Sequence, residues 1–501
     1  MSTSKYYPLS RRSFIKVSAA ATAGISILSL GSCKTEKIPL PIERPVEMPL
    51  PMKRPFGHFN FEVTTLGLGG QASLQWTPAD VDPVPIILKA FKLGINYFDT
   101  SNGYDGSQLN YNKAFKTLNL IPGEINYDDK LRKSIWLTSK TYMRWGKPGW
   151  QERENVNNFS NGIPDVQCAV DDLKRSLTQL FGDNKGAYPQ GAYLDMILIH
   201  SLDHTAEIDV LYEGLETPLD SNGNFGALVA LRDFRDGTNL TGMNPQNEKL
   251  IKHIGFSGHA NPPAMVDMIQ RDEYSILEGM LVAINANDKT KYSMQHNVIP
   301  VAAAKGMGII AMKVFADAAM YHKEPRWSYT PEDVFRKVGT PELPSRPLVE
   351  YSLTTPGIHT AIIGIGQIDE DPLKCQLTQN LHAAQIEPNG MPAHERTRIE
   401  GQAKNVKANS NYFQMEKVGL TAPGNLRKGE NQILWDTAFA GDAPVLRYEV
   451  MVNGQKVGEI EHKPQTLKST PFVFKTILKA NDKVVVVAVD QYGNKAEALL
   501  A

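Results

Sequence analysis

A carboxylate and a phenol stand five residues apart in the segment GINYFDTSNGYDGS, where Asp99 closes a short apolar run and Tyr104 follows it. A lysine, Lys140, ends the run SIWLTSK, and a histidine, His200, ends the run LDMILIH. A phenol with a pKa near 10 is a poor acid or base at neutral pH. A neighbouring ammonium lowers that pKa, a carboxylate keeps the ammonium charged, and an imidazole can donate to a substrate oxygen. Together these side chains predict a site that delivers a proton to a carbonyl group.

Such a site moves a proton but holds no electrons, so it implies a cofactor that carries hydride. Three other readings of these residues are open. Lys140 and Asp99 could form an ion pair with only a structural role. His200 and His204 have the i, i+4 spacing of a zinc pair, but they lie across a strand end rather than on a helix, and we predict no metal site. A glycosidase would need two carboxylates at strand ends, and only Asp99 is so placed.

The elements that position these groups are short β-rich runs that alternate with helical patterns. Eight such runs occur, at residues 61–69, 95–99, 134–140, 194–200, 251–257, 280–285, 308–314 and 359–366. This pattern predicts an α/β fold, a (β/α)8 TIM barrel, over residues 57–412. A doubly wound sheet fits less well, because the first run ends in Gly-Leu-Gly-Gly and not in G-x-G-x-x-G. In a barrel the side chains at the carboxyl ends of the strands converge on one mouth.

From about Gln414 the pattern changes to short β-rich runs, with a hairpin turn at Asn453-Gly454. This predicts a small all-β sandwich over residues 413–501, similar to a fibronectin type III or immunoglobulin domain, with Trp435 in its core. No candidate catalytic group stands out there. We expect a spacer or an interaction module, which could receive an electron-transfer or assembly partner.

The amino-terminal segment SRRSFIKVSAAATAGISILSLGSC resembles a twin-arginine export signal, with Arg11 and Arg12 ahead of a weakly apolar run. It ends in LGSC, which resembles a lipoprotein box with Cys33 as the acylated residue. A charged leader that ends at a chance cysteine is the alternative. We expect a signal over residues 1–33 and a proline-rich linker over 34–56. The protein would then be periplasmic or on the cell surface, lipid-anchored to a bacterial membrane.

The composition of the chain bears on which classes of binding partner to expect. The chain has 501 residues, 42% of them hydrophobic and 21% charged, and its formal net charge is −1. This balance gives no electrostatic case for a nucleic-acid partner. We expect contact with a membrane only through the lipid at Cys33. The other cysteines, Cys168 and Cys375, form no Cys-x-x-Cys pair, so neither a disulfide framework nor a cysteine metal site is expected.

The motifs LGLGG (residues 66–70), FDTSNGYDGS, TSK and LIHSLD occur in the order found in the aldo-keto reductases, and residues 60 to 385 resemble that family. The resemblance implies a carbonyl reductase or alcohol dehydrogenase that depends on NADP or NAD and acts on a small-molecule carbonyl or alcohol. It makes Tyr104 the proton donor, with Asp99, Lys140 and His200 as its partners.

The same resemblance implies a set of cofactor-binding residues. Ser257 would contact the nicotinamide amide, and the adenine side would fall to Gln379 and Asn380. The full set is Gly69, Gly70, Ser257, Lys313, Gln379 and Asn380, and Asn287 fits an asparagine of the bacterial members. The chain departs from the family where Asp105 replaces a glycine and where Gln376 stands at the place of an arginine for the 2′-phosphate. The choice between NADP and NAD is therefore open.

Aromatic residues in two predicted mouth loops could stack on a sugar ring, or could pack within their loops. They are Tyr142, Trp145 and Trp150, and then Tyr321, Trp327 and Tyr329. Nicotinamide cofactors are made in the cytoplasm, so an exported enzyme would need to hold its cofactor tightly. The alternative from another class is a non-catalytic barrel lipoprotein that binds glycans or serves assembly.

Overall fold

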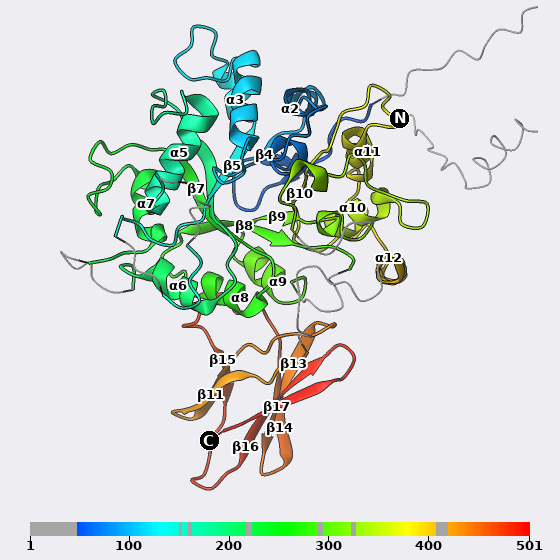
Figure 1. The fold of residues 1–501 in the computed structure, drawn as a ribbon. Coiled ribbons are helices and arrows are strands. Elements are labelled where there is room, and N and C mark those ends of the chain that lie inside the picture. The colour runs from blue at the N-terminus through cyan, green and yellow to red at the C-terminus, as the bar shows by residue number, and fades with distance from the viewer. Residues whose placement is uncertain are drawn as a thin grey trace, which may run out of the picture. The chain divides into compact units, whose positions relative to one another are not determined.

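A computed structural model describes residues 48–149, 153–158, 163, 165–216, 223–287, 294–321, 327–406 and 419–500. These residues form a parallel β-barrel surrounded by helices and, after it in the chain, a set of antiparallel sheets (Figure 1). The predicted signal over 1–33, its Arg11, Arg12 and Cys33, and most of the predicted linker lie outside the described residues, and so does Trp150. Those expectations stay predictions.

The barrel closes through eight parallel strands in the order β10-β3-β4-β5-β6-β7-β8-β9, as the sequence predicted. Most strand residues are buried, which is the pattern of parallel strands covered by helices on the outside and packed side chains within. The strands are β3 (Leu66–Leu68), β4 (Tyr97–Asp99), β5 (Trp136–Thr141), β6 (Leu194–Ile199), β7 (Ile251–Gly258), β8 (Leu277–Ala283), β9 (Gly308–Met312) and β10 (Thr360–Ile363).

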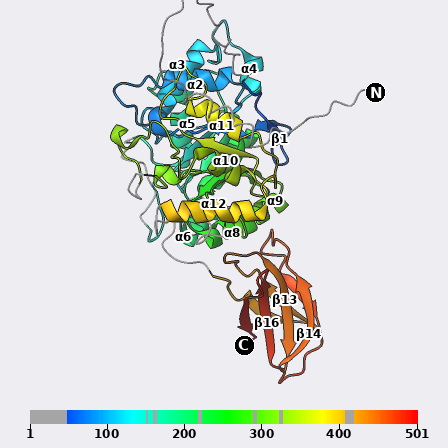
Figure 2. The same cartoon turned by 90° about the vertical axis from the view of Figure 1, so that its right-hand side faces the viewer.

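Helices surround the barrel, and Figure 2 shows α10 and α12 on one side of it. The helical patterns that alternate with the β-rich runs in the sequence form helices here, and α5 packs against β5. The helices are α2 (Val84–Lys92), α3 (Ser107–Thr117), α4 (Asp129–Lys133), α5 (Ala169–Phe181), α6 (Thr205–Tyr212), α7 (Ala227–Asp236), α8 (Pro262–Gln270), α9 (Val298–Ala304), α10 (Ser345–Leu353), α11 (Gln376–Ala383) and α12 (Ala393–Val406).

A hairpin precedes the barrel, and it begins inside the segment predicted as linker. Strand β1 (Lys53–Pro55) pairs antiparallel with β2 (Glu62–Thr64), so the first predicted run is divided between β2 and β3. Arg54 is buried, and its guanidinium donates to the carbonyl oxygens of Leu353 at 2.9 Å and Ile358 at 2.8 Å. The predicted boundary at residue 56 is therefore a few residues late. The proline-rich composition did not reveal this, because the partners of Arg54 lie some 300 residues away along the chain.

The carboxyl-terminal part forms a three-stranded sheet, β11-β12-β15, and a four-stranded sheet, β14-β13-β16-β17. Trp435 is fully buried and lies 5.5 Å, centroid to centroid, from Tyr448, which confirms its predicted place in that core. The strands are β11 (Gly424–Gly429), β12 (Gln432–Asp436), β13 (Val445–Val452), β14 (Gln455–Glu461), β15 (Phe472–Lys475), β16 (Val484–Asp490) and β17 (Lys495–Leu499).

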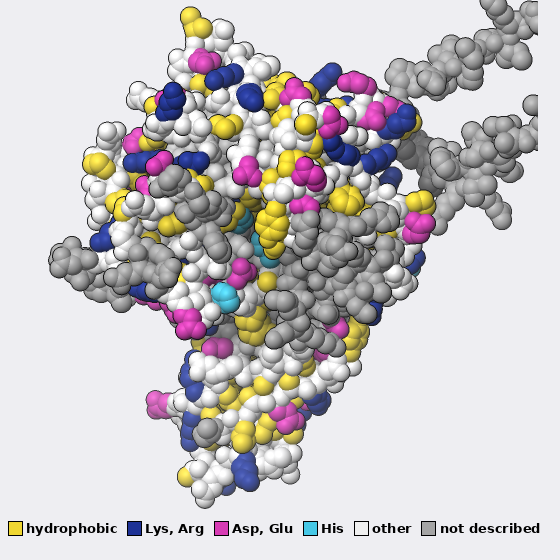
Figure 3. All heavy atoms as spheres, in the orientation of Figure 1, with side chains coloured by type: hydrophobic (Ala, Val, Ile, Leu, Met, Phe, Trp, Pro, Cys, Tyr) yellow, Lys and Arg dark blue, Asp and Glu magenta, His cyan; other side chains and the backbone are white. Residues whose placement is uncertain are grey.

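Acidic and basic side chains are interspersed on the face drawn in Figure 3, and neither sign forms a continuous field there. This agrees with the near-zero net charge of the sequence. Across the described ranges, no helix combines the length and apolar character needed to cross a membrane.

Candidate active site

The four predicted catalytic side chains meet at the carboxyl ends of neighbouring barrel strands. Asp99 is the last residue of β4, Lys140 is the penultimate residue of β5, and His200 directly follows β6. Tyr104 lies in the loop between β4 and α3. All four are buried, with no more than 7% of any of them exposed to solvent. The strands run parallel around a closed barrel, so side chains that are far apart in sequence share one end of it.

Glycine at the end of β3 permits this close approach of strand ends. A Cβ atom on Gly70 would stand 2.4 Å from the carbonyl oxygen of Asp99 and 2.8 Å from the Cα atom of Thr100. No side chain fits at that distance, so any larger residue would push the strand end that bears Asp99. Gly70 therefore has a steric role in the site in addition to lining the cavity.

Lys140 and Asp99 form a buried ion pair at the base of the site. The Lys140 Nζ atom donates to Asp99 Oδ1 at 2.6 Å and to the carbonyl oxygen of Thr100 at 2.9 Å. Burial raises the pKa of Asp99 while Lys140 opposes that rise. Burial likewise lowers the pKa of Lys140 against the pull of Asp99. Each charge is thus kept in the low-dielectric interior by the other.

The Tyr104 ring lies over this pair, with its centroid 4.6 Å from the Lys140 Nζ atom. Contrary to the sequence expectation, the pKa of Tyr104 is raised well above 10. Burial is the main cause, and the nearby Tyr142 and Asp99 add to it. Burial of the phenol disfavours the phenolate more strongly than the neighbouring ammonium favours it. The raised pKa favours the neutral phenol, the form that can donate a proton to a carbonyl oxygen.

Next to the phenol, His200 completes the site as a neutral imidazole. Burial and the surrounding cations, Lys140 among them, lower its pKa well below 6.5. Its ring lies edge-on to that of Tyr104 at a centroid separation of 5.9 Å, and it packs against Tyr142 at 4.2 Å. The Nδ1 atom of His200 is buried, and no described residue hydrogen-bonds to it. A neutral imidazole offers one donor and one acceptor nitrogen to a ligand.

These groups lie in a cavity of about 630 Å³, a size typical of cofactor and ligand sites. Asp99, Tyr104 and His200 line it together with the strand ends at Gly69 and Gly70. Much of the remaining wall comes from the carboxyl ends of β9 and β10 and the residues that follow them, including Met312, Lys313, Val314, Phe315, Ile362, Ile363 and Gly364, and from the segment at Trp327, Ser328, Tyr329 and Val334.

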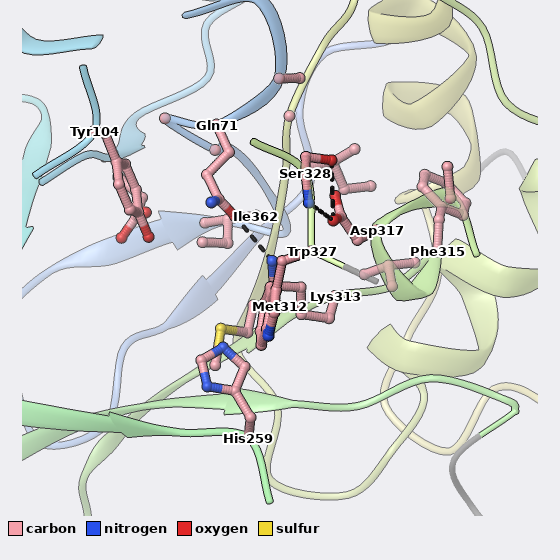
Figure 4. Close-up of a pocket in the computed structure, with 18 of the residues that line it drawn as sticks. Gln71, Tyr104, His259, Met312, Lys313, Phe315, Asp317, Trp327, Ser328 and Ile362 are labelled. Carbon is pink, nitrogen blue, oxygen red and sulfur yellow. Dashed lines mark hydrogen bonds between the residues drawn. The ribbon is translucent and has the colours of Figure 1, made fainter. Parts of the chain in front are cut away.

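Two walls of the cavity are joined by Lys313, whose Nζ atom donates to Gln71 Oε1 at 2.9 Å (Figure 4). The same Nζ atom lies 4.6 Å from the Trp327 ring centroid, and Trp327 packs edge-on against His259 at 5.2 Å. Lys313 has a φ of 59°, an uncommon backbone conformation for a residue with a side chain. An ammonium presented between the glycine-lined strand ends suits the phosphates of a dinucleotide, so the residues present fit such a cofactor.

The predicted cofactor-binding residues divide into two groups. Gly69, Gly70 and Lys313 line the cavity, whereas Ser257, Gln379 and Asn380 are absent from its wall as the structure has it. The Ser257 hydroxyl accepts the backbone N–H of Ser201 at 2.9 Å. On α11, Gln379 donates to the carbonyl oxygen of Leu373, and Asn380 accepts from Gln376 at 2.8 Å. Asn287 is buried and is also absent from the wall. Contacts from these residues to a cofactor stay predictions.

The aromatic candidates also divide. Tyr142, Trp327 and Tyr329 line the cavity, whereas Trp145 and Tyr321 are buried elsewhere. His204 is the N-cap residue of α6, and the described part of the chain holds no cluster of residues that could bind a metal ion.

Sequence reasoning missed several residues of the wall, namely Gln71, Trp76, Asp203, His259 and Phe335. Gln71 could have been found, because it directly follows the paired glycines. The residue after the phenol, Asp105, has a φ of 26°, within the left-handed region that glycine adopts most easily. The departure from the family pattern at Asp105 therefore keeps a backbone that the pattern's glycine would favour.

The raised pKa of Tyr104 predicts how carbonyl reduction depends on pH. A phenol with a raised pKa keeps its proton below that value, so the acid form needed for reduction persists at alkaline pH. An unperturbed phenol has a pKa of about 10, and that of Tyr104 is higher. We therefore expect that titration of Tyr104 does not change kcat for reduction between about pH 7 and about pH 9. Steady-state rates with NADPH and an aldehyde check this. A titration of Tyr104 itself below pH 9, followed by its ultraviolet difference spectrum, would contradict it.

Known proteins resemble this chain in sequence pattern and in fold. The sequence profile of the aldo/keto reductase family matches residues 65–342, more than half of the chain. The chain is similar to the holo form of an aldo-keto reductase from Bacillus halodurans, with 19% identity and a TM-score of 0.43, over 71% of this chain and 97% of that one. It is also similar to an aldo/keto reductase from Klebsiella pneumoniae in complex with NADP and acetate, with 15% identity and a TM-score of 0.42, over 72% and 98%. No curated protein matches the sequence.

Proposed function

Because the chain belongs to the aldo/keto reductase family, it is an NAD(P)-dependent oxidoreductase, and we propose that Tyr104 moves the proton in its reaction with a small carbonyl or alcohol substrate. The observation that carries this proposal is the buried Lys140–Asp99 pair beneath a protonated phenol at the inner end of the cavity. Both ions are buried, and the Lys140 ammonium lies against the ring of the phenol that would give up the proton.

The bound cofactor, NADP or NAD, supplies the hydride. The residues of the chain handle the proton and the charge. The Tyr104 hydroxyl donates its proton to the carbonyl oxygen, and the Lys140 ammonium, 4.6 Å from the ring, stabilises the phenolate that remains. Asp99 keeps that ammonium charged and fixed in the interior. His200, neutral and beside the phenol, donates to the same oxygen and orients the carbonyl. In the reverse direction the same groups remove the proton of an alcohol.

A sugar is the substrate class that we propose within this activity. The support is the mixture of flat and polar side chains on the cavity wall: Tyr142, Trp327 and Tyr329 offer rings, and Asp203 and Asp333 offer carboxylates. Rings pack against the apolar faces of a sugar while carboxylates accept from its hydroxyls. An apolar aldehyde has no hydroxyl groups to donate to these carboxylates, so it would make fewer hydrogen bonds with the wall. Turnover of aldoses and ketoses with both cofactors, compared with apolar aldehydes of similar size, tests this. A preference for the apolar compounds would contradict it.

We further propose that the protein is exported by the twin-arginine route and anchored at Cys33, carrying a tightly held cofactor. The support is the Arg11-Arg12 pair, the LGSC segment and the need for a cofactor outside the cytoplasm. A protein that crosses the membrane folded can take its cofactor along. The cofactor would be restored within a redox-neutral cycle on one substrate, or by an electron-transfer partner.

Purification from membranes of the native host, followed by mass spectrometry of released small molecules, tests this second proposal. We expect about one nucleotide per protein chain, because a cofactor with a dissociation constant far below the protein concentration stays bound during purification. A lipid-modified peptide that begins at Cys33 should appear in the same sample. Empty protein that binds NAD(H) and NADP(H) only weakly would overturn the tightly held cofactor, and an unprocessed amino terminus would overturn the anchor.

A further inference from the structure

One buried carboxylate next to the site has no part in the proton transfer described above. Asp172 lies in the first turns of α5, has 1% of its surface exposed, and forms no ion pair with any described residue. Its oxygens accept from the Asn102 side-chain amide, from the Thr141 hydroxyl at 2.7 Å and from the backbone N–H of Tyr142 at 2.9 Å. Burying a carboxylate that only neutral donors stabilise costs folding free energy, which suggests that Asp172 has a role beyond stability.

The first donor belongs to the loop that carries the phenol. Asn102 stands two residues before Tyr104 and is buried, and its amide nitrogen faces the Asp172 carboxylate. The backbone N–H of Tyr104 in turn donates to the carbonyl oxygen of Ser101 at 3.0 Å. Movement of Asn102 would therefore carry Tyr104 with it.

The other two donors belong to the end of β5, which carries Lys140. The carbonyl oxygen of Thr141 accepts the backbone N–H of His200 at 2.9 Å, and the Tyr142 ring packs against the His200 ring. Asp172 thus holds, with one oxygen, the loop that bears Tyr104 and, with the other, the strand end that positions Lys140 and His200.

Two neighbouring acids show that this arrangement differs from ordinary helix capping. Asp171 performs that task, because its carboxylate accepts the backbone N–H groups of Gln167 and Cys168 ahead of α5. Asp172 makes no such contact, and its three partners all lie on the site side. Burial raises the pKa of Asp172 to about 6, against the hydrogen bonds of Thr141 and Asn102, so the group is an ionised acceptor at neutral pH.

We propose that Asp172 is a positioning residue for the reaction, one that sets the distance between Tyr104 and the Lys140–His200 wall through Asn102 on one side and through Thr141 and Tyr142 on the other. The inference rests on the proposed function of the same site. Asp172 itself would contact neither substrate nor cofactor. Loss of the Asp172 contacts should therefore lower kcat and leave cofactor affinity unchanged.

The test is an exchange of the two side chains, because Asp172→Asn alone is not diagnostic. The Oδ1 atom of Asn102 has no hydrogen-bond partner among the described residues, so the Asn102 amide could turn over and accept from the new asparagine. Asn102→Asp instead sets two carboxylates against each other. The double variant Asn102→Asp/Asp172→Asn restores one donor and one acceptor with the same shapes.

With NADPH and glyceraldehyde as the probe, we expect Asn102→Asp to lower kcat roughly 10- to 100-fold, the cost of a misplaced catalytic group. The dissociation constant of NADPH, measured by protein fluorescence, should not change. The double variant should regain most of the lost kcat. Asp233→Asn is the matched control, since Asp233 is also buried and held by neutral donors, Thr238 at 2.6 Å and Thr241 at 2.6 Å, but is absent from the cavity wall. It should lower stability and keep kcat.

The outcomes separate the inference from the function on which it rests. Wild-type protein with no turnover of any aldehyde or sugar overturns the proposed function and this inference with it. Active wild-type protein with an unaffected Asn102→Asp variant overturns the inference alone. So does a folded Asp172→Ala variant with wild-type kcat, or a double variant that stays as impaired as Asn102→Asp while its melting temperature recovers.

Discussion

Replacing Tyr104 with phenylalanine should lower turnover by roughly 10²- to 10⁴-fold, the contribution expected of one general acid. The change removes one oxygen from a buried ring that makes contact with Lys140 and His200, so the cavity keeps its shape. The dissociation constant of the nicotinamide cofactor should stay as in the wild type, because the phenol delivers the proton and does not hold the nucleotide. Steady-state kinetics and fluorescence titration with NADPH measure the two effects separately.

Tyr142→Phe is the matched control for this prediction. Tyr142 also lines the cavity and packs against His200, at 4.2 Å, whereas the Lys140 ammonium lies against the ring of Tyr104. Its loss should change KM more than kcat. Equal losses of kcat in both variants would contradict the assignment of the proton to Tyr104. A wild-type protein that binds cofactor yet reduces nothing, with no change in Tyr104→Phe, would favour the non-catalytic barrel.

Lys140→Met should lower the free energy of unfolding by about 3–5 kcal/mol, the cost of leaving a buried charge without its partner. Asp99 has 2% of its surface exposed, and it keeps only that one cation as a direct ion-pair partner among the described residues. The pKa of Asp99 is raised in the native state, and loss of Lys140 removes the attraction that opposes this rise. Denaturation by urea, followed by circular dichroism, measures the loss.

The loss of stability in Lys140→Met should depend on pH, because the pKa of Asp99 is raised in the native state. An acid whose native pKa lies above its unfolded value stabilises the fold while it is protonated, and the benefit is lost as pH rises through the native pKa. The deficit of Lys140→Met relative to wild type should therefore be larger at pH 8 than at pH 5, values on either side of neutral. The double variant Asp99→Asn/Lys140→Met should recover most of the stability, because no bare charge remains, but none of the activity. A deficit that grows toward low pH would contradict this account.

The sequence by itself determined the barrel and the place of the four candidate catalytic side chains at its strand ends. Asp99, Lys140 and His200 each follow an apolar run, and a strand in a parallel barrel can only place its end at the common mouth. These signals are local: they depend on residue type and on distance along the chain from a strand end. The order of the motifs around them also pointed to the family whose profile matches residues 65–342.

Only the tertiary structure decided the protonation of the site and the residues that support it. The sequence showed an ammonium near Tyr104 but not how deeply the phenol is buried, and burial reverses the direction of its pKa shift. Asp172 carries no local signal, since its partners Asn102 and Thr141 lie 70 and 31 residues away. Arg54, within a proline-rich segment, is held by the carbonyl oxygens of residues that come some 300 positions later in the chain. Desolvation and long-range hydrogen bonds arise when distant segments pack together, so the fold determines them and the local pattern of residues does not.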